Sequence, residues 1–176
     1  MKPTFVPAMR FLLRHEGGWS NHPKDKGGMT NLGVTKRAWE DHIGHAVSET
    51  EMRDLTADTV TPFYKKRYWD AVHADELSSG VDYCVFDAAV NSGPSKAVRL
   101  LQDALGVRID GQLGPKTLLA ARDSPAHSLV ANYTTARLDY LHSLPQWSTF
   151  GKGWQRRVEE VEQEAIKFAT NAEAMS

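Results

Sequence analysis

The chain has 176 residues, of which 41% are hydrophobic and 24% are charged, and its formal net charge is −1 at neutral pH. This composition is typical of a soluble globular protein and gives no indication of a nucleic-acid partner or an anionic membrane. The single cysteine, Cys84, excludes a disulfide within the chain, and its apolar neighbours predict that it is buried.

The N-terminal segment predicts an amphipathic helix. Apolar residues recur at helical spacing from Phe5, Thr4 is a suitable N-cap, and two consecutive glycines after Glu16 end the pattern. Glu16 falls on the apolar face of the last turn, so we expect its carboxylate to point toward the core or a cleft.

The rest of the chain also has mostly helical periodicity. Only Met29–Thr35 has the pattern of a short β-hairpin, and Pro62 is expected to bend or delay the helix that contains it. Thr35, Ser48 and Thr56 are predicted N-caps. Helices are predicted over 36–43, 48–55, 56–72, 79–93, 95–105, 114–123, 125–143 and 149–172. The fold class is therefore mainly α, with one small hairpin near residues 29–35.

The stretch His15–Thr35 carries the residues best suited to catalysis. Glycoside hydrolysis needs a carboxylic acid that protonates the leaving oxygen and a second carboxylate on the opposite face of the sugar ring. Glu16, at the apolar end of a helix, suits the first role. Asp25, on a polar glycine-rich loop, suits the second, and Thr30 can hold a water with it. The alternative is an ordinary helix-end carboxylate followed by a solvated turn.

The same stretch resembles the signature of glycoside hydrolase family 108, the phage-type N-acetylmuramidases. HEGGWSNHPKDKGGMTNLGVT follows the family's order of Glu-Gly-Gly, an aromatic residue, Asp, Gly-Gly, Thr and Gly-Val-Thr. The spacing of the Glu, Asp and Thr is also similar to that in the lysozymes of T-even phages. Later segments are similar to further blocks of the family: YKKRYWDAV, FDAAVNSGP, LLQDALGVRIDGQLGPKTL and GKGWQRRV.

The resemblance implies a lysozyme-like helical fold and a cofactor-free, endolysin-type muramidase. Such an enzyme hydrolyses the β-1,4 bond between N-acetylmuramic acid and N-acetylglucosamine in bacterial peptidoglycan. Its catalytic residues would be Glu16 as general acid, with Asp25 and Thr30 in support. We further expect a catalytic lobe over 1–92 and a peptidoglycan-binding-like lobe over 93–176, packed as one compact unit. Residues 110–117, DGQLGPKT, resemble a turn of peptidoglycan-binding domains, with a purely structural role as the alternative.

The start of the chain lacks a signal-peptide pattern, and no apolar run is long enough to span a bilayer. Together with the resemblance, this predicts an enzyme that waits in the cytoplasm of a host bacterium until a holin opens the membrane. It would then act in the periplasm or cell wall. We expect a monomer whose partners are peptidoglycan glycan strands, with no nucleic acid and no stable membrane insertion. A role in bacterial protein export is the alternative.

Five further residues are candidate substrate contacts. Trp19, Tyr64 and Tyr68 offer rings that can stack on sugars, although aromatic residues at helical spacing are also typical of a core. Asp87 and Asn91 lie four residues apart on one face of a predicted helix. There they can bind an N-acetyl or hydroxyl group of the sugar, or they can instead tie helices together.

Three other functions stay open on the residues alone. A zinc amidase would use some of the seven histidines, but the chain has no paired metal-ligand motif, and we predict no metal site. A lytic transglycosylase would use Glu16 alone. A non-catalytic peptidoglycan-binding module would keep affinity for the wall with a degenerate site.

Overall fold

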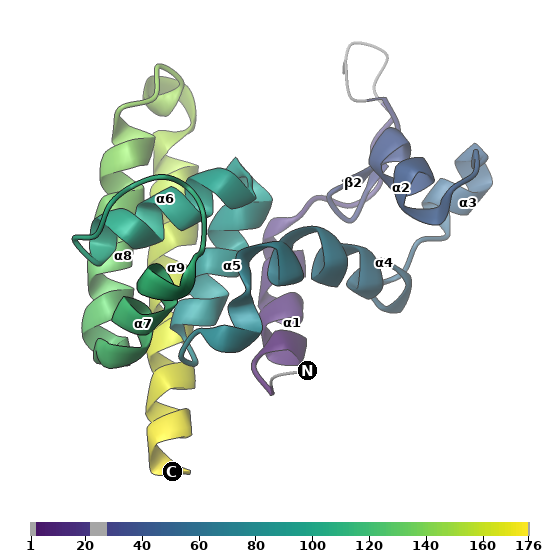
Figure 1. Ribbon diagram of the computed structural model, residues 1–176. Coiled ribbons are helices and arrows are strands. Elements are labelled where there is room, and N and C mark those ends of the chain that lie inside the picture. Colours follow the sequence, from purple (N-terminus) through teal and green to yellow (C-terminus); the bar gives the residue numbers. More distant parts are fainter. Residues whose placement is uncertain (1–2, 22–27, 176) are drawn as a thin grey trace. The chain divides into compact units, whose positions relative to one another are not determined.

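The structure is a computed structural model that describes residues 3–21 and 28–175 (Figure 1). By their internal contacts the residues form two compact units, Val6–Arg67 and Met1–Phe5 with Tyr68–Ser176. We call them the small and the large unit and describe each by itself. The boundary predicted from the sequence lies after residue 92, whereas the contacts divide the chain after residue 67.

The small unit combines short helices with one hairpin. Its elements are α1 (Phe5–His15, of which Phe5 belongs to the large unit), β1 (Thr30–Asn31), β2 (Val34–Thr35), α2 (Lys36–Ile43), α3 (Glu49–Arg53) and α4 (Ala57–Tyr64). The strands pair antiparallel, with Thr30 opposite Thr35. Leu32 and Gly33 form the turn with φ of 50° and 75°, the positive values of a type I′ hairpin. The predicted hairpin is therefore confirmed.

The predicted N-caps of the small unit are also confirmed. The hydroxyl of Thr35 accepts a hydrogen bond from the backbone N–H of Ala38 at 3.2 Å, and Ser48 and Thr56 each form a capping box. Pro62 lies inside α4, and the chain continues after this helix as a π-helical turn, η1 (Lys65–Trp69). The single helix predicted over 56–72 is therefore divided into shorter pieces.

The large unit is a bundle of helices. Its elements after η1 are η2 (Asp70–Val72), η3 (Ala74–Glu76), α5 (Val81–Ser92), α6 (Pro94–Ala104), α7 (Pro115–Asp123), α8 (Ala126–His142) and α9 (Trp147–Ala174). Helix α5 packs against α6, α8 and α9, and α8 runs along α9 (Figure 1). Every residue of α5 from Val81 to Ala89 is buried, because the helix has neighbours on all sides. Cys84 is among these residues, as predicted.

The segment 110–117 is held in place by one buried side chain. The Gln102 amide oxygen accepts hydrogen bonds from the backbone N–H groups of Asp110 and Gly111 at 3.0 and 2.8 Å. The Gln102 amide nitrogen donates to Asp110 Oδ1 at 2.8 Å and to the carbonyl oxygen of Gln112 at 3.0 Å. These contacts give the turn a structural role.

In residues 3–21 and 28–175, none of the helices has both the length and the apolar character needed to cross a lipid bilayer.

Candidate active site

Glu16 meets the hairpin turn at a point where the chain has no room for a side chain. Glu16 is half-buried and follows α1 directly, and its backbone N–H still bonds to the carbonyl oxygen of Leu12 at 3.3 Å. A β-carbon built on Gly33 would lie 2.5 Å from Glu16 Oε2 and 2.5 Å from the Tyr64 hydroxyl oxygen. The carboxylate, the phenol and the backbone of the turn therefore converge at one place, and only glycine fits there.

The turn is fixed from two sides. The Tyr64 hydroxyl donates a hydrogen bond to the carbonyl oxygen of Leu32 at 2.8 Å. The buried side chain of Asn31 donates to the carbonyl oxygens of Met52 and Arg53 at 2.9 and 3.1 Å, at the end of α3. These bonds hold Leu32 in a left-handed conformation that a leucine adopts only at a cost. The backbone beside Glu16 is therefore strongly constrained.

Of the other two predicted catalytic residues, Thr30 and Asp25, the structure describes only Thr30. Thr30 is half-buried in β1, and its backbone exchanges two hydrogen bonds of 2.8 Å with Ser20. Thr30 therefore belongs to the same unit as Glu16. Asp25 lies outside the described residues.

The three aromatic candidates also differ. Trp19 is half-buried, and the guanidinium carbon of Arg53 lies 4.3 Å from its ring centroid, which covers one face of the ring. Tyr64 is only 1% exposed, so its ring offers no open face for a sugar, and its hydroxyl serves the turn instead. Tyr68 is half-buried in the π-helical turn η1, which follows the helix that contains Tyr64.

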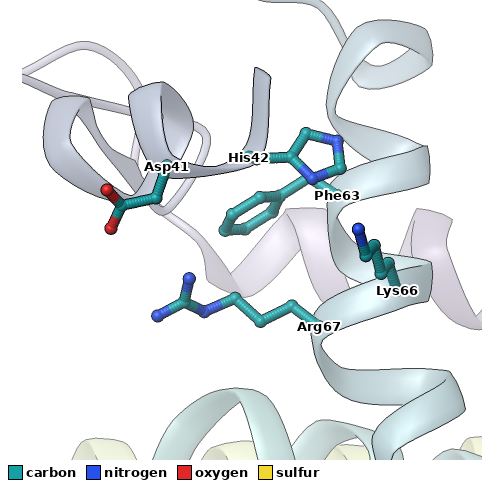
Figure 2. Close-up of a pocket in the computed structure, with 5 residues that line it drawn as sticks. All are labelled: Asp41, His42, Phe63, Lys66 and Arg67. Carbon is teal, nitrogen blue, oxygen red and sulfur yellow. The ribbon is translucent and has the colours of Figure 1, made fainter. Parts of the chain in front are cut away.

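A charged cavity of about 240 Å³ lies elsewhere in the small unit, between α2 and the segment from Phe63 to Arg67 (Figure 2). Its lining contains none of the predicted site residues: it is formed by Asp41, His42, Phe63, Lys66 and Arg67. No sequence motif indicates this cavity, since its five residues come from two segments more than 20 positions apart.

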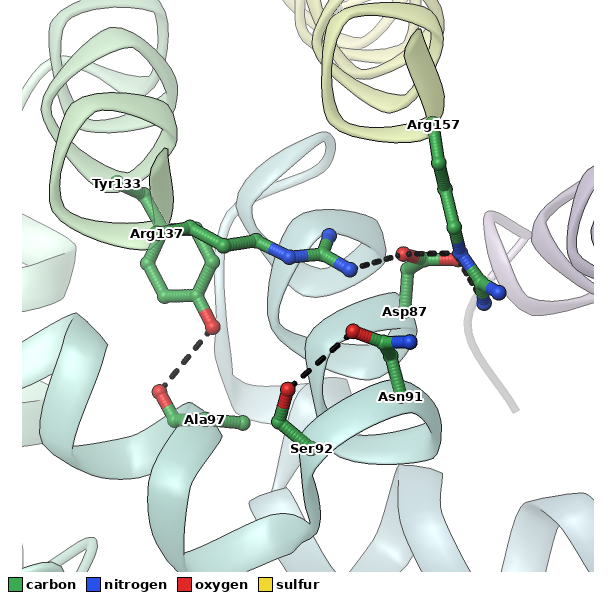
Figure 3. A network of polar contacts seen from close by, with 7 residues as sticks. All are labelled: Asp87, Asn91, Ser92, Ala97, Tyr133, Arg137 and Arg157. Atoms are coloured by element: carbon green, nitrogen blue, oxygen red, sulfur yellow. Dashed lines mark hydrogen bonds and ion pairs between the residues drawn. The ribbon is translucent and has the colours of Figure 1, made fainter. Parts of the chain in front are cut away.

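Asp87 is the centre of a buried ion cluster in the large unit (Figure 3). Its Oδ2 lies 2.8 Å from Nη2 of Arg137 on α8, and its Oδ1 lies 2.9 Å from Nη2 of Arg157 on α9. Burial alone would raise the pKa of Asp87, but the two arginine charges and their hydrogen bonds outweigh it and hold the pKa below its usual value. Asp87 therefore ties three helices together, which is the second of its two predicted roles.

Asn91, one turn further along α5, is exposed and accepts a hydrogen bond from the Ser92 hydroxyl at 3.3 Å. It keeps the exposure that a sugar contact requires. Its substrate-binding role stays a prediction.

Two features of the site were missed from the sequence. The turn conformation of Gly33 could be predicted, because a glycine between two short strands is typical of a turn with positive φ. Its contact with Glu16 could not be predicted from the sequence. The roles of Arg137 and Arg157 could not be predicted either, because their partner Asp87 lies 50 and 70 positions away in the sequence.

Within the described part of the chain, no three histidine, cysteine or carboxylate side chains come together in a way that could hold a metal ion.

Comparisons with known proteins agree with this architecture. The model of the family described as glycosyl hydrolase 108 matches residues 9–93, and that of a predicted peptidoglycan domain matches residues 96–159. Among solved structures, the chain is similar to SagA of Brucella abortus with a TM-score of 0.83 and 42% sequence identity. The similarity covers 96% of this chain and 97% of that one. A comparison with curated proteins found no match.

These similarities confirm the mainly α, lysozyme-like fold with its small hairpin. The first family model names a glycosyl hydrolase and the second a peptidoglycan domain, and the structural similarity extends over nearly the whole chain. The chain therefore belongs to the glycosyl hydrolase 108 family and is a glycoside hydrolase that acts on peptidoglycan.

Proposed function

We propose that this protein is a muramidase that hydrolyses the β-1,4 bond between N-acetylmuramic acid and N-acetylglucosamine, with Glu16 as the general acid. The observation that carries the proposal is the convergence of the Glu16 carboxylate, the Tyr64 hydroxyl and the backbone of Gly33. A half-buried carboxylate on a constrained backbone supports a role in proton transfer to a leaving oxygen.

The second group of the reaction is proposed to be Asp25, which precedes the hairpin in the sequence. Thr30, on β1, is proposed to hold the water that is consumed. In this scheme Glu16 donates its proton to the glycosidic oxygen while Asp25 acts on the opposite face of the sugar ring. Trp19, Tyr68 and Asn91 are retained as proposed substrate contacts because each is at least partly exposed.

The proposal is tested by clearing of purified cell walls with wild type and the Glu16→Gln variant. We expect the variant to lose about 10²- to 10⁴-fold in rate while keeping its fold, because it retains the shape of the side chain and lacks the proton. Asp58→Asn is the matched control, since it removes an exposed carboxylate from the same unit.

A folded Glu16→Gln variant that clears walls as fast as wild type would contradict the assignment. The Asp25→Asn variant then measures the need for a second carboxylate. Mass spectrometry of the products separates the muramidase from the alternative transglycosylase, because hydrolysis adds one water to the released muropeptide.

The proposed biological setting is that of an endolysin of a bacteriophage, released to the cell wall by a holin. The support for it is the resemblance of the signature stretch to phage-type muramidases. In this setting the protein would act as an antimicrobial agent on the host's own wall.

A further inference from the structure

The charged cavity of the small unit has the features of a binding site. It measures about 240 Å³ and lies between α2, which supplies Asp41 and His42, and the segment that supplies Phe63, Lys66 and Arg67 (Figure 2). Phe63 is 2% exposed, so its ring forms an apolar wall rather than a mobile surface group. The side chains of Lys66 and Arg67 extend from their turn toward α2 (Figure 2).

The charges at this cavity have no partners within the described residues. There, no ion pair joins Lys66, Arg67 or Asp41 to an opposite charge, and the Arg67 guanidinium carbon lies 5.7 Å from the Phe63 ring centroid. Two other cations of the same unit do have partners: Arg53 lies 2.7 Å from Glu49, and Lys36 lies 3.6 Å from Glu40. The cavity therefore holds charges that a ligand can satisfy.

The backbone under the two cations is also unusual. Lys66 and Arg67 both belong to η1, a π-helical turn that begins three residues after Pro62. Turns of this kind are rare and occur frequently at functional sites. This observation is independent of the cavity and points to the same two residues.

The size and the charges of the cavity define the ligand. Sites for whole small molecules measure roughly 300–1,000 Å³, so this cavity suits an end group of a larger molecule. Arg67 and Lys66 can bind a carboxylate, Asp41 can bind an ammonium group, and the Phe63 wall accepts the aliphatic carbons between them. A group with this combination is the charged end of a short peptide.

Peptidoglycan strands carry short peptides with carboxylates and amino groups beside the glycosidic bonds. We propose that the cavity lined by Asp41, Lys66 and Arg67 binds the charged end of this peptide, and so makes the enzyme prefer peptide-bearing strands over bare glycan. The inference rests on the proposed function, because it assumes that the strand whose peptide is bound in this cavity is the strand that the enzyme cleaves.

The test compares two substrates, intact cell walls and the same walls after an amidase has removed their peptides. Binding is measured by co-sedimentation in the Glu16→Gln background, so that no substrate is consumed. We expect Arg67→Gln to weaken binding to intact walls about five- to tenfold and to change binding to peptide-free walls less than twofold. The control is Arg10→Gln, which removes an exposed arginine from α1 of the same unit and should change neither.

Two outcomes of the co-sedimentation would overturn the inference: an equal loss on both substrates, or no loss on intact walls. A competition arm identifies the ligand chemistry. The released peptides should displace the protein from intact walls, whereas inorganic phosphate at the same concentration should not. Displacement by phosphate alone would show a general anion site and would also overturn it. The binding measurements stand even if wild type clears no wall, so failure of the proposed function is seen separately.

Discussion

The two units of the molecule use polar groups in opposite ways. In the small unit, the polar contacts of Asn31 and Tyr64 fix a strained turn beside a half-buried carboxylate. In the large unit, the polar cluster joins three helices, and its centre, formed by Asp87 and Arg137, is buried. A constrained backbone therefore fixes the surroundings of the Glu16 carboxylate in one unit, whereas side-chain ion pairs hold the helices together in the other.

The largest effect on stability is expected from Asp87→Asn. The substitution leaves Arg137, which is 2% exposed, without its counter-charge, and breaking a buried ion pair typically costs about 3–5 kcal/mol. We expect urea unfolding of the large unit, followed by fluorescence of its buried Trp69, to shift accordingly. Asp139→Asn removes an exposed carboxylate from α8 and serves as the control; an equal shift for both variants would disprove the role of the cluster.

The same cluster has a pH signature. Since the pKa of Asp87 is lower in the folded than in the unfolded protein, its stabilising contribution is complete above the ordinary aspartate pKa of about 3.9. It is lost as the pH falls through the folded value. Wild type should therefore lose stability below about pH 4, and Asp87→Asn should lack that part of the loss.

An intermediate effect, centred on activity, is expected from Gly33→Ala. The new β-carbon would collide with Glu16 Oε2 and the Tyr64 hydroxyl, and the φ of 75° adds strain, for a total of about 1–3 kcal/mol. Clearing of cell walls should fall sharply because Glu16 is displaced. Gly44→Ala is a matched control: its φ is 83°, but no atom lies within 4 Å of the added carbon. If both variants lose activity equally, the contact with Glu16 is not the cause.

The smallest effect is expected from Thr35→Ala, which removes the N-cap of α2. Loss of such a cap costs about 1 kcal/mol, because the backbone N–H of Ala38 loses its acceptor. Urea unfolding read from Trp39, on the same helix, measures the change. Thr35→Ser keeps the hydroxyl and should stay close to wild type. A serine variant as unstable as the alanine one would assign the effect to the lost methyl group instead.

Local signals were sufficient to predict most of the elements. Caps such as Thr35 and the Gly-containing hairpin turn act within a few residues, so the sequence alone reveals them. The π-helical turn at Lys65–Trp69 was missed because the same amino-acid composition is compatible with an α-helical and a π-helical turn. The sequence-based boundary at residues 92/93 lies close to the point where the two family matches meet, whereas the division after residue 67 depends on which helices surround α5.

The sequence predicted those features of the candidate site that depend on neighbouring residues in the chain. Glu16 was placed at a helix end by periodicity, and the structure has it there. The roles of Asp87 and Tyr64 depend on partners far away in the chain: Arg137 and Arg157 for one, and the carbonyl oxygen of Leu32 for the other. No spacing rule connects such residues.

The buried cluster also bears on how such enzymes can be recombined. The two family matches meet between residues 93 and 96, which invites an exchange of modules at that point. A chimera joined there would give Asp87 to one parent and Arg137 and Arg157 to the other, and would leave the apolar surface of α5 to a foreign bundle. A junction at residue 67 takes α5 and both arginines from the same parent. The N-terminal segment that can be exchanged without dividing the cluster is therefore shorter than the family match over residues 9–93.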